Sequence, residues 1–313
     1  MKTPWVGRHL LAMLPSVRGS LRSNVPLARY TWFRTGGKAE VLFTPLDLAD
    51  LVRFLAECPE GTPFTVIGLG SNILIRDGGI PGVVIRIIRG QSSIKMDGRD
   101  LIVGAGATDL RVSRVAAGAG IAGLEFLSGV PGSIGGAIRM NASAYGQEVA
   151  DILVSATVVD RKGLMRKQSA DEFCFGYRKS TLPKDSIVVE AHFRGHKESS
   201  SRIAKTTMAV QETRSATQPI KARTGGSTFI NPPGHTAWRL IESAGCRGLQ
   251  NGGARVSEKH CNFLVNDGAA TSADIEGLGK EVRRRVFCET GVLLSWEIRR
   301  LGRHGQSNRD FKV

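Results

Sequence analysis

Apolar side chains along this chain follow two spacings, and the spacing predicts where helices and strands lie. Apolar residues at helical spacing predict helices over five segments: 46–58, 110–119, 199–213, 237–244 and 272–290. Short runs rich in β-branched residues, bounded by glycine or proline, predict strands over 39–44, 64–67, 72–76, 83–88, 93–96, 100–104, 151–160 and 186–193. The predicted strand 39–44, helix 46–58 and strand 64–67 form a βαβ-like unit, and short strands follow it.

The change of pattern along the chain predicts three lobes with a basic segment at each end. No period of 20 to 50 residues recurs, which argues against a repeat architecture. The predicted divisions are an irregular N-terminal extension (1–24), a first lobe (25–88), a second lobe (89–198), a third lobe (199–301) and a basic C-terminal tail (302–313).

Composition narrows the class of protein without choosing a function. The 313 residues carry a formal net charge of +15, so anionic partners are expected. The densest basic cluster, Arg283-Arg284-Arg285, falls inside a predicted helix and is read as a solvated helix face. Aromatic residues are few and no zinc-finger, homeodomain or RNP-like signature is present. Nucleic acid is therefore not an expected partner.

The cysteines and the N-terminus bear on the cellular compartment. Five scattered cysteines without a C-x-x-C pair argue against a disulfide framework or a zinc site, so no metal is expected. The apolar part of residues 1–14 is too short to span a bilayer and lacks a signal-peptidase pattern. A cytoplasmic protein without a membrane span is expected.

Two glycine-rich loops carry the main chemical signal. Gly68-Leu69-Gly70-Ser71-Asn72 follows a predicted strand, and Gly129-Val130-Pro131-Gly132-Ser133-Ile134-Gly135-Gly136 is closed by the segment Asn141–Gly146. Glycines and small residues leave backbone N–H groups accessible to phosphate oxygens. Two such loops predict a dinucleotide cofactor.

A third glycine cluster, Gly118-Ala119-Gly120-Ile121-Ala122-Gly123, matches the G-x-G-x-x-G fingerprint by letter only. The fingerprint follows a strand and opens a helix, whereas these glycines follow a predicted helix. They are predicted to end that helix in a tight turn.

Together with Trp32-Phe33-Arg34-Thr35-Gly36-Gly37, the two loops resemble the flavin-binding half of the UDP-N-acetylenolpyruvoylglucosamine reductase family. The resemblance continues in Tyr177-Arg178-Lys179-Ser180, Gly226–Pro232 and Ser295-Trp296-Glu297-Ile298, and it covers about residues 25 to 300. It implies an α+β fold: a two-lobed FAD-binding domain of the vanillyl-alcohol-oxidase (PCMH) type, followed by an α+β substrate-binding domain.

The resemblance also implies a reaction. An enzyme of this family reduces UDP-N-acetylglucosamine enolpyruvate to UDP-N-acetylmuramate, with NADPH as co-substrate and FAD as cofactor. Hydride passes from reduced flavin N5 to C3, Arg178 and Glu297 stabilise the enolate, and Ser227 protonates C2. Neither loop has a histidine for covalent flavin attachment, so non-covalent FAD is expected.

The other expected site residues follow from the same motifs. The expected FAD contacts are Arg34, Gly68, Gly70, Ser71, Asn72, Gly129, Pro131, Gly132, Ser133, Gly135, Gly136 and Asn141. The expected substrate contacts are Tyr177, Asn231, Lys259 and His260. Ile230 departs from relatives that carry lysine at this position, which leaves a phosphate contact to Lys221, Arg223, Lys259 or His260. The short segment between Ser180 and Val188 lacks a tyrosine-bearing loop, as in the shorter subtype.

Two alternatives remain open at this point. A carbohydrate or alcohol oxidase of the same flavin superfamily would use oxygen as its acceptor. A basic nucleic-acid-binding protein would contain no flavin, and only the net charge favours it. For the reductase reading a monomer is expected.

Overall fold

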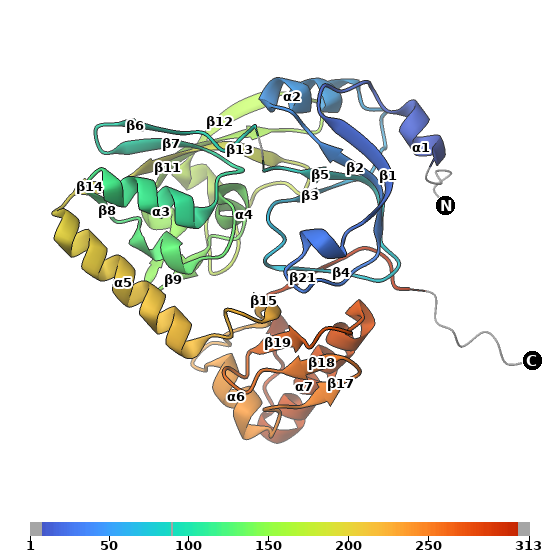
Figure 1. Cartoon of the computed structure of the whole chain (residues 1–313), viewed down its shortest axis with the longest axis vertical. Helices are drawn as coiled ribbons and strands as arrows, with labels where there is room; N and C mark the ends of the chain where they lie inside the picture. Colours follow the sequence, from blue (N-terminus) through green and yellow to red (C-terminus); the bar gives the residue numbers. More distant parts are fainter. Residues whose placement is uncertain (1–7, 89, 306–313) are drawn as a thin grey trace, which may run out of the picture. The chain divides into compact units, whose positions relative to one another are not determined.

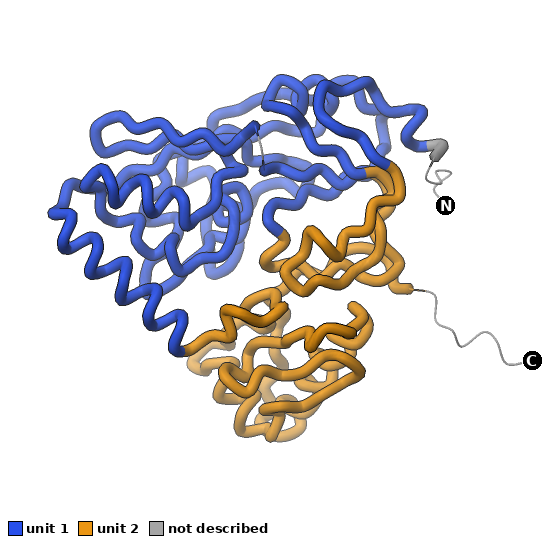
Figure 2. Tube along the Cα trace, in the orientation of Figure 1, with its two compact units in different colours: residues 1–22, 42–69, 83–216 blue, residues 23–41, 70–82, 217–313 orange. Residues whose placement is uncertain are grey.

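A computed structural model describes residues 8–88 and 90–305 (Figure 1). The chain divides into two compact units: unit 1 comprises 1–22, 42–69 and 83–216, and unit 2 comprises 23–41, 70–82 and 217–313 (Figure 2). The helices are α1 (Arg8–Met13), α2 (Leu48–Glu57), α3 (Asp109–Gly118), α4 (Ile134–Arg139), α5 (Ser200–Thr217), α6 (Ala237–Ser243) and α7 (Ser272–Thr290). Short 3-10 helices are η1 (Ala28–Tyr30), η2 (Glu125–Gly129), η3 (Val149–Asp151) and η4 (Ala170–Phe173).

A five-stranded sheet forms the larger part of unit 1. Its order is β12 (Met165–Ser169), β11 (Leu153–Val159), β13 (Ile187–Arg194), β7 (Asp100–Gly104) and β6 (Ile94–Asp97), with antiparallel neighbours. Helix α4 packs against β13, and α3 packs against η2. Small two-stranded pairs complete this part of unit 1: β9 (Ser143–Ala144) with β10 (Gln147–Glu148), and β8 (Ile121–Ala122) with β14 (His196–Lys197).

A second sheet has the order β1 (Ser20–Pro26), β2 (Lys38–Thr44), β5 (Ile80–Arg86) and β3 (Phe64–Ile67). Strand β3 pairs parallel with β5, from Phe64↔Val83 to Ile67↔Arg86. Asp47 caps the N-terminus of helix α2, where its carboxylate accepts a hydrogen bond from the Asp50 N–H. The helix buries Phe54 against Phe43, with ring centroids 4.2 Å apart. The apolar residues of α2 recur at helical spacing and therefore form one face, which the helix buries against the protein interior.

Unit 2 is built around α6, α7 and a four-stranded sheet. The sheet order is β15 (Arg223–Ser227), β19 (Phe263–Asn266), β18 (Ala254–Val256) and β17 (Gln250–Asn251). Two short pairs join it: β16 (Phe229–Ile230) with β20 (Ser295–Trp296), and β4 (Ile73–Ile75) with β21 (Arg299–Leu301). Buried side chains of α7, including Ile275, Leu278 and Val282, pack with Phe229 and Ile298 in one apolar cluster.

The mixed helix and strand content confirms the predicted α+β class. The helices expected over 46–58, 110–119, 199–213, 237–244 and 272–290 are all present, with ends that differ by a few residues. The reading of Gly118–Gly123 as a helix end is also confirmed, because α3 stops at Gly118 and Gly120 has φ +68°.

The prediction that the N-terminal extension is irregular was wrong where the structure describes it. Helix α1 and the start of β1 lie within residues 8–24. Exposure alternates along the seven residues of strand β1, but polar Ser23 stands between Leu21 and Val25 at the less exposed positions, so the apolar alternation that reveals a half-buried strand is interrupted. Residues 1–7 and most of the predicted basic tail, 306–313, lie outside the described residues.

The two compact units are each assembled from three separate segments of the chain, whereas the predicted lobes are consecutive stretches. The lobe boundaries inferred from the sequence therefore stay predictions. Within residues 8–88 and 90–305, no helix is both long and apolar enough to cross a membrane.

Candidate active site

The longer glycine loop is held against the start of α3 in unit 1. Thr108 and Ser133 form an isolated antiparallel bridge. On either side of it, the Asp109 N–H donates to the Gly132 carbonyl over 3.2 Å and the Ile134 N–H donates to the Ala107 carbonyl over 3.0 Å. The loop therefore has a fixed main-chain path before α4 begins.

The two glycine loops meet at Gly68 and Ser133. A Cβ atom placed on Gly68 would lie 2.3 Å from the Ser133 Oγ, so the missing side chain is what lets the serine hydroxyl approach. Ser133 is buried, and Gly136 lies on its other side, where a Cβ would be 3.8 Å from the same hydroxyl. Two glycines and a serine hydroxyl therefore lie together here, and backbone N–H groups with a hydroxyl are a donor set that suits a pyrophosphate.

Two other glycines of this loop are explained by packing within the protein. A Cβ on Gly129 would lie 2.5 Å from the Tyr145 ring, and one on Gly135 would lie 3.1 Å from the Ala105 Cβ. A side chain would therefore overlap the Tyr145 ring at position 129 and would be tightly packed against Ala105 at position 135, whether or not a ligand is bound. Their expected role as direct FAD contacts stays a prediction, as does that of Pro131.

Tyr177 and Arg178 form the tip of a tight turn in unit 1. Gly176 and Lys179 exchange both main-chain hydrogen bonds, at 3.0 and 3.1 Å. Arg178 has φ +59°, a left-handed conformation that is uncommon for a non-glycine residue and concentrates at functional sites. The Asn141 side chain donates to the Gly176 carbonyl and accepts from the Ala150 N–H. Asn141 thus anchors this turn.

The side chain of Arg178 points to the segment that closes the glycine loop. Its Nη1 donates to the Ser143 carbonyl over 3.0 Å and to the Ser143 Oγ over 2.9 Å. Its guanidinium carbon lies 5.5 Å from the centroid of the Tyr177 ring. Ser143 is a residue that our sequence analysis missed, although it lies inside the quoted segment Asn141–Gly146.

The short segment after this turn is fixed by Arg139. Its guanidinium donates to the carbonyls of Leu182, Pro183 and Ser186, and its own carbonyl accepts from the Ser180 hydroxyl over 3.0 Å. Arg139 therefore holds the segment from Ser180 to Ser186 in a compact, internally hydrogen-bonded path.

In unit 2, the main chain at Tyr30 and Trp32 lies in contact with Gly70. A Cβ on Gly70 would lie 2.0 Å from the Tyr30 carbonyl oxygen, and the Trp32 N–H donates to the Gly70 carbonyl over 3.0 Å. Arg34 has φ +57° and is exposed, and its Nη1 donates to the Arg29 carbonyl. Close main-chain contact explains why glycine stands at position 70.

Ser227 is the last residue of β15 and Glu297 directly follows β20, and the segments next to them pair in unit 2. Phe229 pairs with Trp296, and the Glu297 N–H donates to the Thr228 carbonyl over 2.9 Å. Thr228 is the residue after Ser227, so the pairing brings the two expected catalytic residues to one place. Ser227 follows a break in the β15 register between Thr224 and Ser227, where Gly226 has φ +80°.

Asn262 and Asn72 support this pair of strands. The Asn262 side chain accepts from the Phe229 N–H over 2.9 Å and donates to the Phe229 carbonyl over 2.8 Å. The Asn72 side chain donates to the Glu297 carbonyl over 3.3 Å. Asn72 was expected at FAD, and this hydrogen bond gives it a second task that the sequence did not indicate.

Three of the expected substrate contacts also lie in unit 2. The Asn231 side-chain oxygen accepts from the Ala237 N–H over 2.9 Å at the start of α6. Lys259 is exposed. Burial lowers the pKa of His260, and its Nδ1 accepts from the Asn262 N–H over 3.2 Å. A neutral His260 that accepts at Nδ1 carries its proton on Nε2, which makes that atom a donor.

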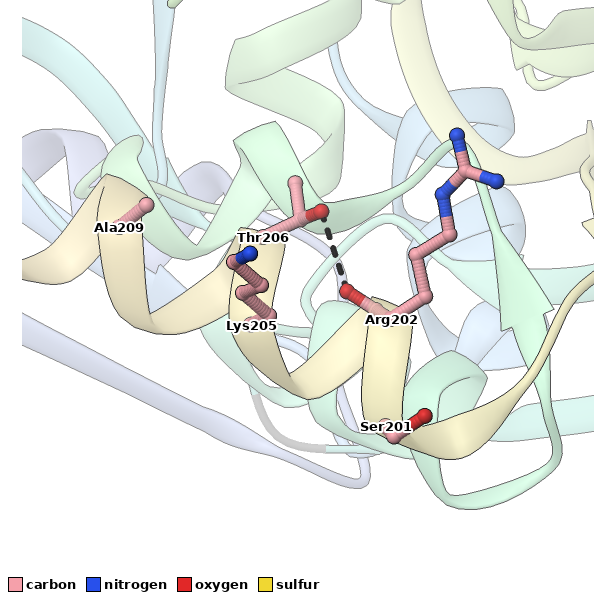
Figure 3. Close-up of a pocket in the computed structure, with 5 residues that line it drawn as sticks. All are labelled: Ser201, Arg202, Lys205, Thr206 and Ala209. Carbon is pink, nitrogen blue, oxygen red and sulfur yellow. Dashed lines mark hydrogen bonds between the residues drawn. The ribbon is translucent and has the colours of Figure 1, made fainter.

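The structure thus divides the expected residues between the two units. Unit 1 holds the Gly68–Ser133 contact and the Arg178 turn, whereas unit 2 holds Ser227, Glu297 and Asn72. A hollow in the surface of α5 is lined by other residues: Ser201, Arg202, Lys205, Thr206 and Ala209 (Figure 3). Within the described part of the chain, no cluster of three or more His, Cys, Asp and Glu side chains is arranged to hold a metal ion.

Two family models match the chain. One, described as the C-terminal domain of UDP-N-acetylenolpyruvoylglucosamine reductase, matches residues 218–301. The other, described as an FAD binding domain, matches residues 39–169, which include both glycine loops.

Curated relatives and a solved structure agree with these matches. A UDP-N-acetylenolpyruvoylglucosamine reductase from Azorhizobium caulinodans is 56% identical over 94% of this chain and 95% of its own length. One of the same description from Parvibaculum lavamentivorans is 54% identical over 94% of each chain. The crystal structure of the UDP-N-acetylenolpyruvylglucosamine reductase from Thermus caldophilus is 34% identical, covers 92% of this chain and 100% of that one, and superposes with a TM-score of 0.81.

Proposed function

This chain belongs to the UDP-N-acetylenolpyruvoylglucosamine reductase family, and from that membership we propose the reaction and the roles of its residues. The protein is an FAD-dependent oxidoreductase that uses NADPH to reduce the enolpyruvyl ether of UDP-N-acetylglucosamine to the lactyl ether. The observation that supports this most directly is the pairing of the Glu297 N–H with the Thr228 carbonyl, beside Ser227. The oxidase reading has no comparable support.

The residues of unit 1 fit FAD. The Gly68–Ser133 contact leaves no room for a Cβ at position 68 and presents backbone and a hydroxyl instead. Gly68, Gly132 and Ser133 would hold the pyrophosphate. When bound, FAD supplies the two-electron chemistry by taking a hydride from NADPH and delivering it to the substrate.

Arg178 would bind the carboxylate of the enolpyruvyl group. Negative charge spreads into this carboxylate when C3 of the ether receives a hydride, and a guanidinium binds a carboxylate through parallel, charge-assisted hydrogen bonds. Support comes from its place at the tip of a fixed turn, with its Nη1 held by Ser143.

Glu297 and Ser227 would handle the proton. Glu297 would share a proton with the enolate oxygen, which lowers the energy of the developing charge. Ser227 would then give its hydroxyl proton to C2. A hydroxyl is a very weak acid, but an enolate carbon is a strong base, so Ser227 needs no neighbouring base to activate it.

The remaining assignments follow from family membership and stay proposals. Tyr177, Asn231, Lys259 and His260 would contact the nucleotide sugar, and the Nε2–H of His260 suits a phosphate or uracil oxygen. The product would enter peptidoglycan synthesis, in the cytoplasm and with the enzyme acting as a monomer. The three lobes 25–88, 89–198 and 199–301 would be its folding divisions.

One anaerobic experiment tests the reaction and the proton donor. The purified holoenzyme is reduced with NADPH, UDP-N-acetylglucosamine enolpyruvate is added, and flavin reoxidation is followed by absorbance. Wild type is expected to reoxidise promptly. Ser227→Ala is expected to accept electrons from NADPH normally but to form product at least about 100-fold more slowly.

Ser295→Ala is the matched control, since Ser295 is an exposed serine on the neighbouring strand β20. It should behave as wild type. A wild-type protein that reoxidises only with oxygen would overturn the proposed function in favour of an oxidase. Normal product formation by Ser227→Ala would remove Ser227 from the proton-donor role.

A further inference from the structure

Arg178 and Ser143 are joined by two hydrogen bonds from a single nitrogen. Nη1 donates to the Ser143 carbonyl over 3.0 Å and to the Ser143 Oγ over 2.9 Å. Both residues are half-buried, and they are 35 positions apart in the sequence. One terminal nitrogen of a guanidinium carries two hydrogens, so these acceptors use both of them.

The chemistry of these two acceptors matters for an anion-binding arginine. A carbonyl and a hydroxyl are uncharged, so they orient the guanidinium without cancelling its positive charge. Because the guanidinium is planar, fixing Nη1 from two directions also fixes the direction in which the opposite edge of the group points. Paired hydrogen bonds to a carboxylate depend on that direction.

The backbone of Arg178 is fixed by other residues. The Gly176–Lys179 hydrogen bonds close the turn, and the Asn141 side chain binds the Gly176 carbonyl over 3.3 Å. Ser180 donates its hydroxyl to the Arg139 carbonyl over 3.0 Å. The Ser143 hydroxyl is therefore a separate element: it acts on the side chain of Arg178 and not on the turn.

We infer that Ser143 is a positioning residue that orients the Arg178 guanidinium for the carboxylate of the substrate. The inference rests on the proposed function, because it requires a carboxylate-bearing ligand. Through Arg178, Ser143 would therefore affect the binding of ligands that carry the lactyl or enolpyruvyl carboxylate. Other residues would recognise the nucleotide sugar.

Binding of two ligands that differ in the carboxylate tests this role. The oxidised holoenzyme is titrated with UDP-N-acetylmuramate, which carries the carboxylate, and with UDP-N-acetylglucosamine, which does not. Ser143→Ala is expected to weaken binding of the first about tenfold, the effect of one charge-assisted hydrogen bond, and to change binding of the second less than about twofold. Ser143→Thr keeps the hydroxyl and should restore the preference.

Thr181→Ala is the matched control, because it removes a hydroxyl three positions after Arg178 that bonds the Phe173 carbonyl and not the guanidinium. It should retain the wild-type preference for UDP-N-acetylmuramate. If Ser143→Ala retains that preference, or weakens both ligands equally, the positioning role is wrong. If wild type itself shows no preference for the carboxylate ligand and is not reoxidised by the enolpyruvyl substrate, the proposed function fails first.

Discussion

The side-chain amide of Asn72 donates a hydrogen bond to the main-chain carbonyl of Glu297, over 3.3 Å and across 225 positions of sequence. The Asn72 carbonyl in turn accepts from the Arg299 N–H over 3.1 Å. These two bonds lie on either side of Ile298 and hold the main chain directly after the Glu297 α-carbon. A residue that the sequence presents as the end of a predicted cofactor loop thus also binds the main chain of the proposed catalytic carboxyl residue.

Replacing Asn72 by alanine should slow the reaction with the enolpyruvyl substrate. Loss of the hydrogen bond leaves the Glu297 carbonyl without this donor and loosens its position, which we expect to lower kcat/KM about tenfold. Steady-state kinetics with purified holoenzyme measure this effect. Asn251→Ala is the control, because Asn251 also donates to a main-chain carbonyl, that of Asp274, but at an exposed position. Equal kinetics for the two variants would show that the Asn72 bond does not position Glu297.

Replacing Gly70 by alanine should destabilise the protein by about 2 kcal/mol or more, because strain and steric overlap add. Gly70 has φ +70°, and a Cβ there would lie 2.0 Å from the Tyr30 carbonyl oxygen. Gly61 has φ +79° with no atom within 4 Å of its Cβ position, so Gly61→Ala isolates the cost of the backbone conformation. Denaturant unfolding of both variants, without added FAD, measures the difference. Similar losses would mean that the main chain at Tyr30 adjusts freely.

Replacing Glu276 by glutamine should cost about 3 kcal/mol, because it removes the carboxylate from a largely buried ion pair. The Glu276 side chain is 4% exposed and is bound by Arg76 at 2.8 Å and Arg300 at 3.2 Å. Lys280, 4.0 Å from Glu276 and 59% exposed, gives a control: Lys280→Ala should cost less than about 1 kcal/mol.

The same pair has a pH dependence with a definite sign. The hydrogen bond from Arg76 holds the pKa of Glu276 below its ordinary value of 4.5. Its stabilising contribution is therefore complete above that value and is lost as the pH falls through and below it. The free energy of unfolding of wild type, measured from pH 7 to pH 3, should drop toward that of Glu276→Gln. If the difference in free energy of unfolding between wild type and Glu276→Gln stayed constant from pH 7 to pH 3, the lowered pKa of Glu276 would not be the cause of the pH dependence.

Replacing Asp109 by asparagine should stabilise the protein at neutral pH. Asp109 is fully buried, neither carboxyl oxygen has a hydrogen-bond partner among the described residues, and burial raises the pKa of this group well above 3.8. The unfolded chain loses the proton first, so wild-type stability falls as the pH rises above that value. In thermal melts, the melting temperature of Asp109→Asn should exceed that of wild type by more at pH 8 than at pH 4.

Asp97→Asn, at an exposed position on β6, is the surface control for this comparison and should follow wild type at both values. An Asp109→Asn protein less stable than wild type at pH 8 would mean that the carboxylate is charged and bound in the folded protein.

Much of the fold follows from local features of the sequence. The amphipathic face of α2 and the N-terminal caps of α2, α3 and α7 at Asp47, Thr108 and Thr271 are set by residues within one or two turns of each other, which is why those helices were predictable. Strand β1, in which Ser23 interrupts the apolar alternation, and α4, which begins inside a glycine-rich loop, carry no such clear local pattern. They exist because neighbouring segments supply their partners.

The sequence by itself determined the family and the positions of the glycine-rich loops, because the absence of a side chain is a property of the residue type and is visible without a fold. Only the tertiary structure decided which residues act on which. Ser133 meets Gly68, Ser143 holds Arg178 and Asn72 holds Glu297 through contacts between distant segments. Such contacts depend on main-chain path and hydrogen-bond direction, which residue identity alone does not specify.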